Sequence, residues 1–255
     1  MIGVSDSEDP AMARKKFFIL SSSVIAAIVL LSCAPIPVTP PADEMAFAQG
    51  TRRDLQTEYA AMGHGKGKVF AIDPDKSVVR IYVFRGGLAA RSGHNHVVSA
   101  PRFVGYCFVP ATGVSGGRFD LEFRLDELEI DAPVSGSALG SAFASNLTRE
   151  DIEGARRHML GADNMQADEF PLVHVHSVRV VGEAPKFAAD VQVEMHGQTR
   201  EMWVPLTVDG LPDHLSVAGS FVLRQTDFGA KPYSILGGLL AVQDEVVIEF
   251  KLFGA

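Results

Sequence analysis

The stretch RFDLEFRL at residues 118–125 decides the fold class of this chain. Apolar and polar side chains alternate without a break, so that Phe119, Leu121, Phe123 and Leu125 share one face and the charged residues between them share the other. A period of two is typical of a β-strand, because successive side chains point to opposite faces of the sheet. The stretch predicts a strand with one face in a core and one face in water.

The same alternation returns along the carboxyl two thirds of the chain. It occupies residues 79–84, 191–196, 215–224 and 246–251, and Gly- or Pro-containing turns at 116–117, 182–185, 196–198 and 209–212 separate most of the strands. Such turns favour direct reversal of the chain, and hence antiparallel pairing. Long helices do not alternate with these strands, which argues against a parallel α/β sheet. We therefore predict an all-β fold, an antiparallel lipocalin-like β-barrel of about eight strands.

One segment has the features of a helix. Thr148 is a suitable N-cap, acids follow it at 150–151, and Arg156, Arg157 and His158 stand near the end of the stretch, where positive charge stabilises a helix. The sequence predicts one short inserted helix over 148–160 that covers or plugs the barrel.

The amino end has the form of a bacterial lipoprotein signal. Residues 13–33 read ARKKFFILSSSVIAAIVLLSC, three cations followed by an apolar run of signal-peptide length and a cysteine. We predict a signal peptide over 1–32, lipidated Cys33 at the start of a Pro- and Ala-rich tether over 33–68, and a barrel domain over 69–255. Ala34 lacks the acidic character associated with inner-membrane retention, so the predicted location is the periplasmic face of the outer membrane, with the inner membrane as the alternative.

Charge and motifs exclude several functions. The chain has 23 Lys and Arg against 31 Asp and Glu, a net charge of −8 without a basic cluster, which argues against nucleic-acid binding. Once Cys33 is acylated, Cys107 is the only thiol, and its apolar neighbours predict a buried strand residue. No nucleophile elbow, phosphate loop or dinucleotide fingerprint is present. We expect a protein that is not an enzyme and that requires no cofactor.

Three stretches resemble the YceI-like family, bacterial polyisoprenoid-binding proteins of lipocalin-like architecture. They are GARRHMLGADNMQADEFPLVHVHSVRV from residue 154, ADVQVEMHGQTREMWVPLTV from residue 189, and LRQTDFGAKPY from residue 223, which DEVVIEFKL follows. The resemblance covers about residues 69–253 and implies a barrel whose interior holds the isoprenoid tail of a quinone-like or polyprenyl lipid. The candidate lining residues are Phe119, Leu121, Phe123, Val191, Val193, Phe221 and Phe250.

A packed core is the alternative to a ligand cavity, because a period of two does not distinguish a lining from a filled interior. Under that alternative the chain is a structural or stress-response protein of the envelope. Our first hypothesis is an envelope lipoprotein that binds, stores or ferries an isoprenoid or other long-chain lipid. Its partners are then the lipid ligand and, through the anchor, a membrane; a homodimer stays open. Arg91, Asn95 and Tyr233 are candidates for contacts with a lipid head group.

Two histidine pairs carry a competing hypothesis. His94 and His96, and likewise His174 and His176, are spaced so that each pair shares one face of a strand. If the pairs met across a sheet, four imidazoles would form a metal or haem site. Ordinary surface histidines on the polar faces of strands are the simpler interpretation.

Overall fold

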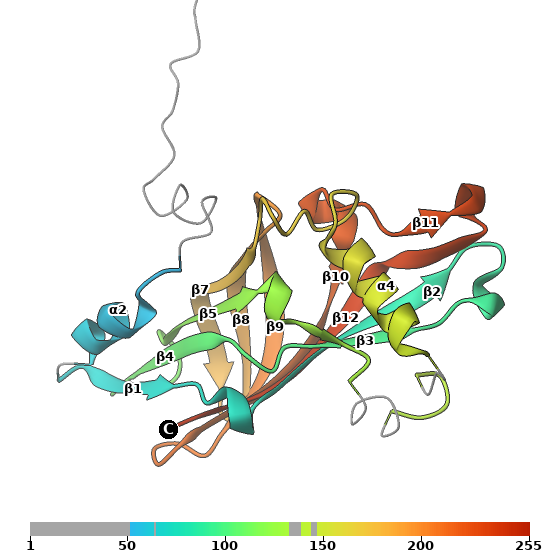
Figure 1. Ribbon diagram of the computed structural model, residues 1–255. Coiled ribbons are helices and arrows are strands. Elements are labelled where there is room, and N and C mark those ends of the chain that lie inside the picture. Colours follow the sequence, from blue (N-terminus) through green and yellow to red (C-terminus); the bar gives the residue numbers. More distant parts are fainter. Residues whose placement is uncertain (1–51, 64, 133–138, 144–146) are drawn as a thin grey trace, which may run out of the picture. The chain divides into compact units, whose positions relative to one another are not determined.

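The computed structural model describes residues 52–63, 65–132, 139–143 and 147–255. The predicted signal peptide, Cys33 and most of the predicted tether lie outside these residues. Within them, one antiparallel sheet curls around a core, and two α-helices pack on it (Figure 1). The strands are β1 (Gly67–Ala71), β2 (Val78–Gly86), β3 (His96–Ser99), β4 (Val104–Pro110), β5 (Arg118–Arg124), β6 (Glu129–Ile130), β7 (Leu172–Glu183), β8 (Lys186–Met195), β9 (Gln198–Asp209), β10 (Leu215–Arg224), β11 (Ser234–Ile235) and β12 (Leu240–Gly254).

The helices are fewer and mostly short. The α-helices are α2 (Leu55–Met62) and α4 (Arg149–Leu160), and the 3₁₀ turns are η1 (Pro74–Lys76), η2 (Ala90–Ser92), η3 (Leu125–Glu127), η4 (Gln225–Phe228) and η5 (Leu236–Gly238). Among the residues that the structure describes, no helix has the length and apolar character that crossing a membrane requires.

The strand pairs close into a ring once interrupted strands are joined. Three long strands are each interrupted once: β1 continues as β2, β3 continues as β4, and β5 continues as β6. The first of these pairs with the second through β1–β4 and β2–β3, and the second pairs with the third through β4–β5 and β3–β6. β7, β8, β9, β10 and β12 continue the sheet, and β12 pairs with β2. Eight long antiparallel strands result, and the predicted lipocalin-type barrel class is confirmed.

The ring is not uniform along its length. β9 and β10 pair over only four residues each, from Leu206 to Asp209 and from Ser216 to Gly219. Beyond these pairs β9 continues beside β8 and β10 continues beside β12, so the two parts of the wall diverge (Figure 1). α4 lies at the wide end (Figure 1), where it contacts β6 and where the Arg156 side chain donates to the Leu128 carbonyl oxygen.

α4 begins where the sequence predicts it. The Thr148 side chain accepts a hydrogen bond from the Asp151 backbone N–H at 3.2 Å, and the Asp151 carboxylate accepts one from the Thr148 backbone N–H at 2.9 Å. This reciprocal capping box satisfies donors that the first turn leaves without partners. Ile152, Ala155 and Met159 pack against the core, which orients the helix over the barrel.

The region before β1 differs from the prediction. We placed residues 52–68 in the tether, but α2 forms there, begins at the N-cap Asp54, and packs on β1 and β4. Leu55 and Tyr59 are fully buried, and the Tyr59 ring stacks on Tyr106 with centroids 5.7 Å apart. The described end of the predicted tether is therefore part of the folded domain.

Candidate functional site

A large apolar cavity lies inside the barrel. Its volume is about 720 Å³, and side chains from all eight long strands and from α4 line it. Close-packed cores contain few voids larger than a water molecule, whereas small-molecule sites enclose about 300–1,000 Å³. The interior is thus a cavity and not the filled core that the sequence left open.

The cavity runs from a mainly apolar end to a mixed end. At the first end, Val109, Val114, Val180 and Val208 line it, together with Tyr106 and Arg118. At the end where α4 lies, polar residues join the lining, namely Ser92, His94, His96, Glu150, Asp151, His158, Asn164, Gln225 and Tyr233. A ligand with a long apolar chain and a small polar head fits this distribution, since each part would meet surface of its own kind.

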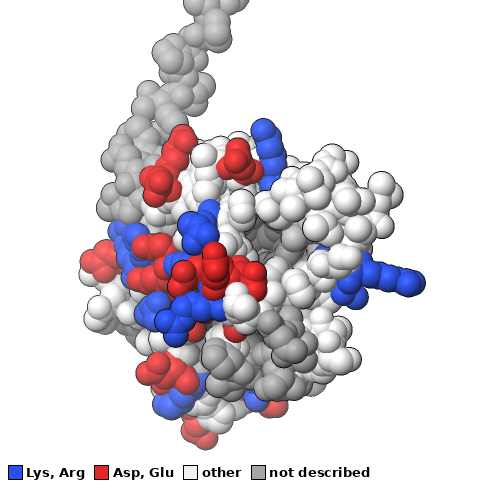
Figure 2. Space-filling view, turned by 45° about the vertical axis from the view of Figure 1, so that its right-hand side comes forward, with Lys and Arg blue, Asp and Glu red and all other residues white. Residues whose placement is uncertain are grey.

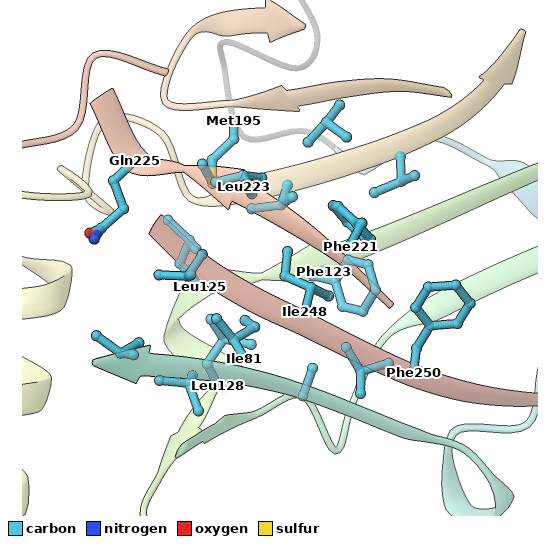
Figure 3. Close-up of a pocket in the computed structure, with 18 of the residues that line it drawn as sticks. Ile81, Phe123, Leu125, Leu128, Met195, Phe221, Leu223, Gln225, Ile248 and Phe250 are labelled. Atoms are coloured by element: carbon cyan, nitrogen blue, oxygen red, sulfur yellow. The ribbon is translucent and has the colours of Figure 1, made fainter. Parts of the chain in front are cut away.

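The structure places all seven candidate pocket residues in the lining. They are Phe119, Leu121, Phe123, Val191, Val193, Phe221 and Phe250, from β5, β8, β10 and β12. In Figure 3, Phe123, Phe221, Ile248 and Phe250 point into one space between the strands, and Gln225 is the labelled side chain that carries a polar group. The close-up shows a site that would hold a ligand chiefly by apolar contact.

The polar end has its own contacts. The His158 ring lies 4.5 Å from that of Tyr233, and the Asn164 amide donates to the Lys231 carbonyl oxygen at 2.7 Å. Of the three residues proposed for a head group, Tyr233 lines the cavity, whereas Arg91 and Asn95 do not. The Asn95 side chain instead accepts a hydrogen bond from the Arg85 N–H and donates one to the Ala142 carbonyl, so it holds a loop.

Cys107 also faces the cavity. It lies on β4, is half-buried, and is the only cysteine among the described residues. Burial raises the pKa of its thiol to about 12. At neutral pH the side chain is therefore an unreactive part of an apolar wall.

The two histidine pairs lie on opposite faces of the sheet. His94 and His96 belong to the cavity lining, and the His96 Nδ1 lies 2.7 Å from Asp131. On β7, Val173 and Val175 line the cavity, so the alternating His174 and His176 face outward. The four imidazoles of the competing hypothesis therefore do not meet. Among the described residues, no three His, Cys, Asp or Glu side chains are arranged to hold a metal ion.

His174 and His176 belong instead to a buried polar network around Asp120. Both imidazoles donate to the Asp120 Oδ1 at 2.9 Å, and the Tyr59 hydroxyl donates to its Oδ2. Arg118 lies 3.3 Å from the same carboxylate, and Arg53 lies 3.6 Å from it. We expected Asp120 and Glu122 on a wet face, but α2 and the residues before it cover both, and each is almost wholly buried.

The network shifts the pKa values of its members. Burial alone would raise the pKa of Asp120, but hydrogen bonds from the two imidazoles and Tyr59 hold it well below its usual range. Burial opposes the charge of His174, yet hydrogen bonds to Asp120 and Glu194 raise its pKa above the usual value. Burial and the adjacent Asp120 charge raise the pKa of Tyr59. Every shift favours one state, an ionised Asp120 that accepts from its neighbours.

Three solved structures are similar to this chain to different degrees, and the first of them supports the fold. The structure of Burkholderia cenocepacia BcnA is similar with a TM-score of 0.54 at 14% identity, over 72% of this chain and 99% of that one. A polyisoprenoid binding domain from Saccharophagus degradans, implicated in plant cell wall breakdown, has a TM-score of 0.48 at 12% identity, over 72% and 97%. The Campylobacter jejuni YCEI protein has a TM-score of 0.36 at 9% identity, over 52% and 70%.

The sequence comparison is more specific than these likenesses of fold. No curated protein matches the chain. The family model described as the YceI-like domain, however, matches residues 70–253, which is nearly the whole barrel. The matched stretch includes every strand from β2 to β10 and all but the last residue of β12. The chain therefore belongs to the YceI-like family.

Proposed function

We propose that this protein binds an isoprenoid or other long-chain lipid in the barrel cavity, and that it stores or ferries this lipid in the bacterial envelope. The observation that carries the proposal is the cavity of about 720 Å³ with its apolar wall. Burial of an apolar chain there gains about 25 cal/mol for each Å² removed from water, before ordering costs. Membership of the YceI-like family supports a ligand of this class, because the family resemblance implies a barrel that holds an isoprenoid tail.

The location is a proposal from sequence. The stretch at 13–33 supports a lipidated Cys33 and a periplasmic domain held at the outer membrane. Two or more acyl chains give stable attachment, whereas one chain gives only marginal binding. The proposal assigns no catalytic step to the cavity, because apolar contact alone accounts for binding.

Native mass spectrometry of the purified protein tests lipid binding. We expect the intact mass to exceed that of the denatured chain by several hundred daltons, and the excess to extract into organic solvent. An excess that matches a metal ion or haem and is lost with chelator would support the competing hypothesis. No excess, even after incubation with polyprenyl lipid in detergent, would refute lipid binding.

Two adjacent residues on β10 supply a matched pair of variants. Phe221 lines the cavity, whereas Val222 is 58% exposed on the outside of the barrel. Phe221→Asp places a carboxylate against the ligand chain and should abolish the lipid excess, because an unpaired charge in apolar surroundings is costly. Val222→Asp changes the same strand by the same chemistry without touching the cavity, and should retain the lipid.

A further inference from the structure

Two loops at the wide end of the barrel form one exposed apolar structure. Leu88, in the loop between β2 and β3, is 91% exposed, and Leu236, in η5, is 73% exposed. Ile235 and Leu239 are exposed beside Leu236. We call these four residues the apolar tip. Large apolar side chains that are exposed together on a protein surface indicate an interaction site.

The tip is held together by the backbones of its two loops. The Leu88 N–H donates to the Gly238 carbonyl oxygen at 3.3 Å, and the Ala89 N–H donates to that of Leu239 at 2.8 Å. At Gly87, a Cβ would lie 2.6 Å from both of these oxygens, so only glycine permits the contact. The two loops are thus built to present their side chains as a unit.

Leu236 has an unfavourable backbone conformation. Its φ is +52°, in the left-handed region that favours glycine, and Gly237 and Gly238 follow with positive φ. Residues with a Cβ persist in this region only where the surrounding structure or a function holds them there. Leu236 gains little from burial within the chain, so its strain and exposure indicate a role outside the folded domain.

The tip borders the mouth of the cavity. Ile235 belongs both to the tip and to the cavity lining, and Ser92, Gly93, Leu240 and Ala241 of the same loops and strand line the cavity as well. A surface that covers the tip would therefore meet the mouth of the cavity, where the apolar Ile235, Leu240 and Ala241 lie beside Ser92, His94 and Tyr233. Across the mouth, α4 contributes Glu150 and Asp151 to the lining.

The two loop segments that form the tip carry charge of one sign, although acids lie nearby at Glu150, Asp151, Asp244 and Glu245. Residues 85–94 and 231–243 contain Arg85, Arg91 and Lys231 and no acid, in a chain of net charge −8. All three cations are exposed. In Figure 2, basic side chains and no acidic ones are visible on the right-hand part of the molecule, whereas both kinds mix on the left. Exposed leucines flanked by Arg and Lys match a bilayer with anionic head groups.

We propose that the apolar tip inserts into the surface of an anionic lipid bilayer and opens the cavity onto its hydrocarbon. This inference rests on the proposed lipid binding and specifies its route, since the ligand would pass between bilayer and barrel without exposing its chain to water. The contact is separate from the predicted anchor at Cys33, which would hold the protein to a membrane in any orientation.

Quenching of tryptophan by brominated lipid tests the contact, because it reports depth and not mere attachment. The full chain is bound to vesicles of equal parts phosphatidylethanolamine and phosphatidylglycerol with brominated acyl chains. Trp203 is the only tryptophan, lies on β9 and is 48% exposed, so the unmodified chain is the control. Leu236→Trp combined with Trp203→Phe moves the single indole to the tip. We expect strong quenching in this variant and little in the control; equal or absent quenching would overturn the proposal.

Uptake kinetics separate this inference from the proposed function. Leu88→Asp with Leu236→Asp should slow uptake of polyprenyl lipid from the same vesicles by about tenfold or more, since burying each leucine in hydrocarbon is worth at least that factor. Val222→Asp should leave the rate unchanged. Loading from detergent should be normal in all three proteins. If the unmodified chain takes up no lipid from detergent, lipid binding itself is refuted. If the double variant loads normally from detergent and takes up lipid from vesicles as fast as the unmodified chain, only the docking to the bilayer is refuted. If the unmodified chain is a dimer, the double variant is a monomer, and the indole at position 236 is not quenched, the tip binds a second copy of the chain. That result would overturn bilayer insertion.

Discussion

Asp120→Asn should destabilise the protein far more than its small change in shape suggests. Asp120 has no exposed surface, and its carboxylate accepts hydrogen bonds from Tyr59, His174 and His176. The amide of asparagine has one acceptor oxygen, and its NH₂ group would face N–H and O–H donors. Each hydrogen bond to a charged group contributes about 1.5–3 kcal/mol, and breaking a buried ion pair costs about 3–5 kcal/mol. Because these terms overlap, we expect the free energy of unfolding to fall by about 3–5 kcal/mol.

Asp126→Asn is the matched control. Asp126 also pairs with an arginine, as the Arg124 Nε lies 2.9 Å from its carboxylate, but its side chain is 53% exposed. Exposed pairs contribute about 0–1 kcal/mol. Urea unfolding followed by circular dichroism gives both values. Equal losses in the two variants would refute the argument that α2 buries the Asp120 charge.

Limited proteolysis of the same proteins would locate the damage. Arg52 and Arg53 precede α2, and the Arg53 backbone N–H donates to the buried Glu122 carboxylate at 3.1 Å. If Asp120→Asn releases α2, trypsin should cleave after these arginines faster than in the control. Global unfolding without early cleavage there would mean that the network stabilises the sheet and not the docking of the helix.

Three further results are expected. Thr148→Ala removes the capping box of α4 and should cost about 0.5–2 kcal/mol, seen as faster hydrogen exchange in that helix. Gly87→Ala forces a Cβ against two carbonyl oxygens and should speed exchange of the Ala89 amide; unchanged exchange would contradict the close approach of the loops. The raised pKa of His174 stabilises the fold below about pH 6.5, and this contribution is lost as pH rises through the folded pKa. The lowered pKa of Asp120 acts oppositely, with stability present above about pH 3.9 and lost in stronger acid. The melting temperature should therefore decline as pH rises above about 6.5, and His174→Gln should flatten that decline.

The strands were predictable because burial follows a local rule. In β5, Phe119, Leu121 and Phe123 alternate with charged residues, and the structure turns these three into the barrel. Capping residues identified α4 in the same way, because Thr148 and Asp151 act within one helical turn.

What lay on the outer face of β5 was not predictable from local pattern. α2 is short and buries only Leu55 and Tyr59, so its sequence has no clear amphipathic period. The docking of α2 depends on Asp120, which is more than sixty positions away. In the sequence, Asp120 and Glu122 have the pattern of a solvent-exposed strand face. The four-histidine metal site of the competing hypothesis failed for a related reason. The spacing of residues determines which of them share a face of a strand, but not what covers that face.

The size of the cavity also needed the structure. Apolar residues at alternate positions describe a filled core and a hollow barrel equally well. The difference arises from where strands separate, and that depends on pairing between segments distant in the sequence. The tip shows the same limit, because Leu88 and Leu236 are typical core residues by type and become notable only through their exposure.

The short ladder between β9 and β10 makes the barrel wall compliant. Beyond the four paired residues of each strand, widening the gap between β9 and β10 breaks no backbone hydrogen bonds between them, although it would disturb η4, where Phe228 is fully buried and the His196 Nδ1 lies 2.9 Å from the Phe228 carbonyl oxygen. Widening the cavity there would therefore cost fewer backbone hydrogen bonds than widening a fully paired barrel. Branched and straight-chain lipids should consequently bind with similar affinity, and selectivity should depend more on the head group than on the shape of the chain.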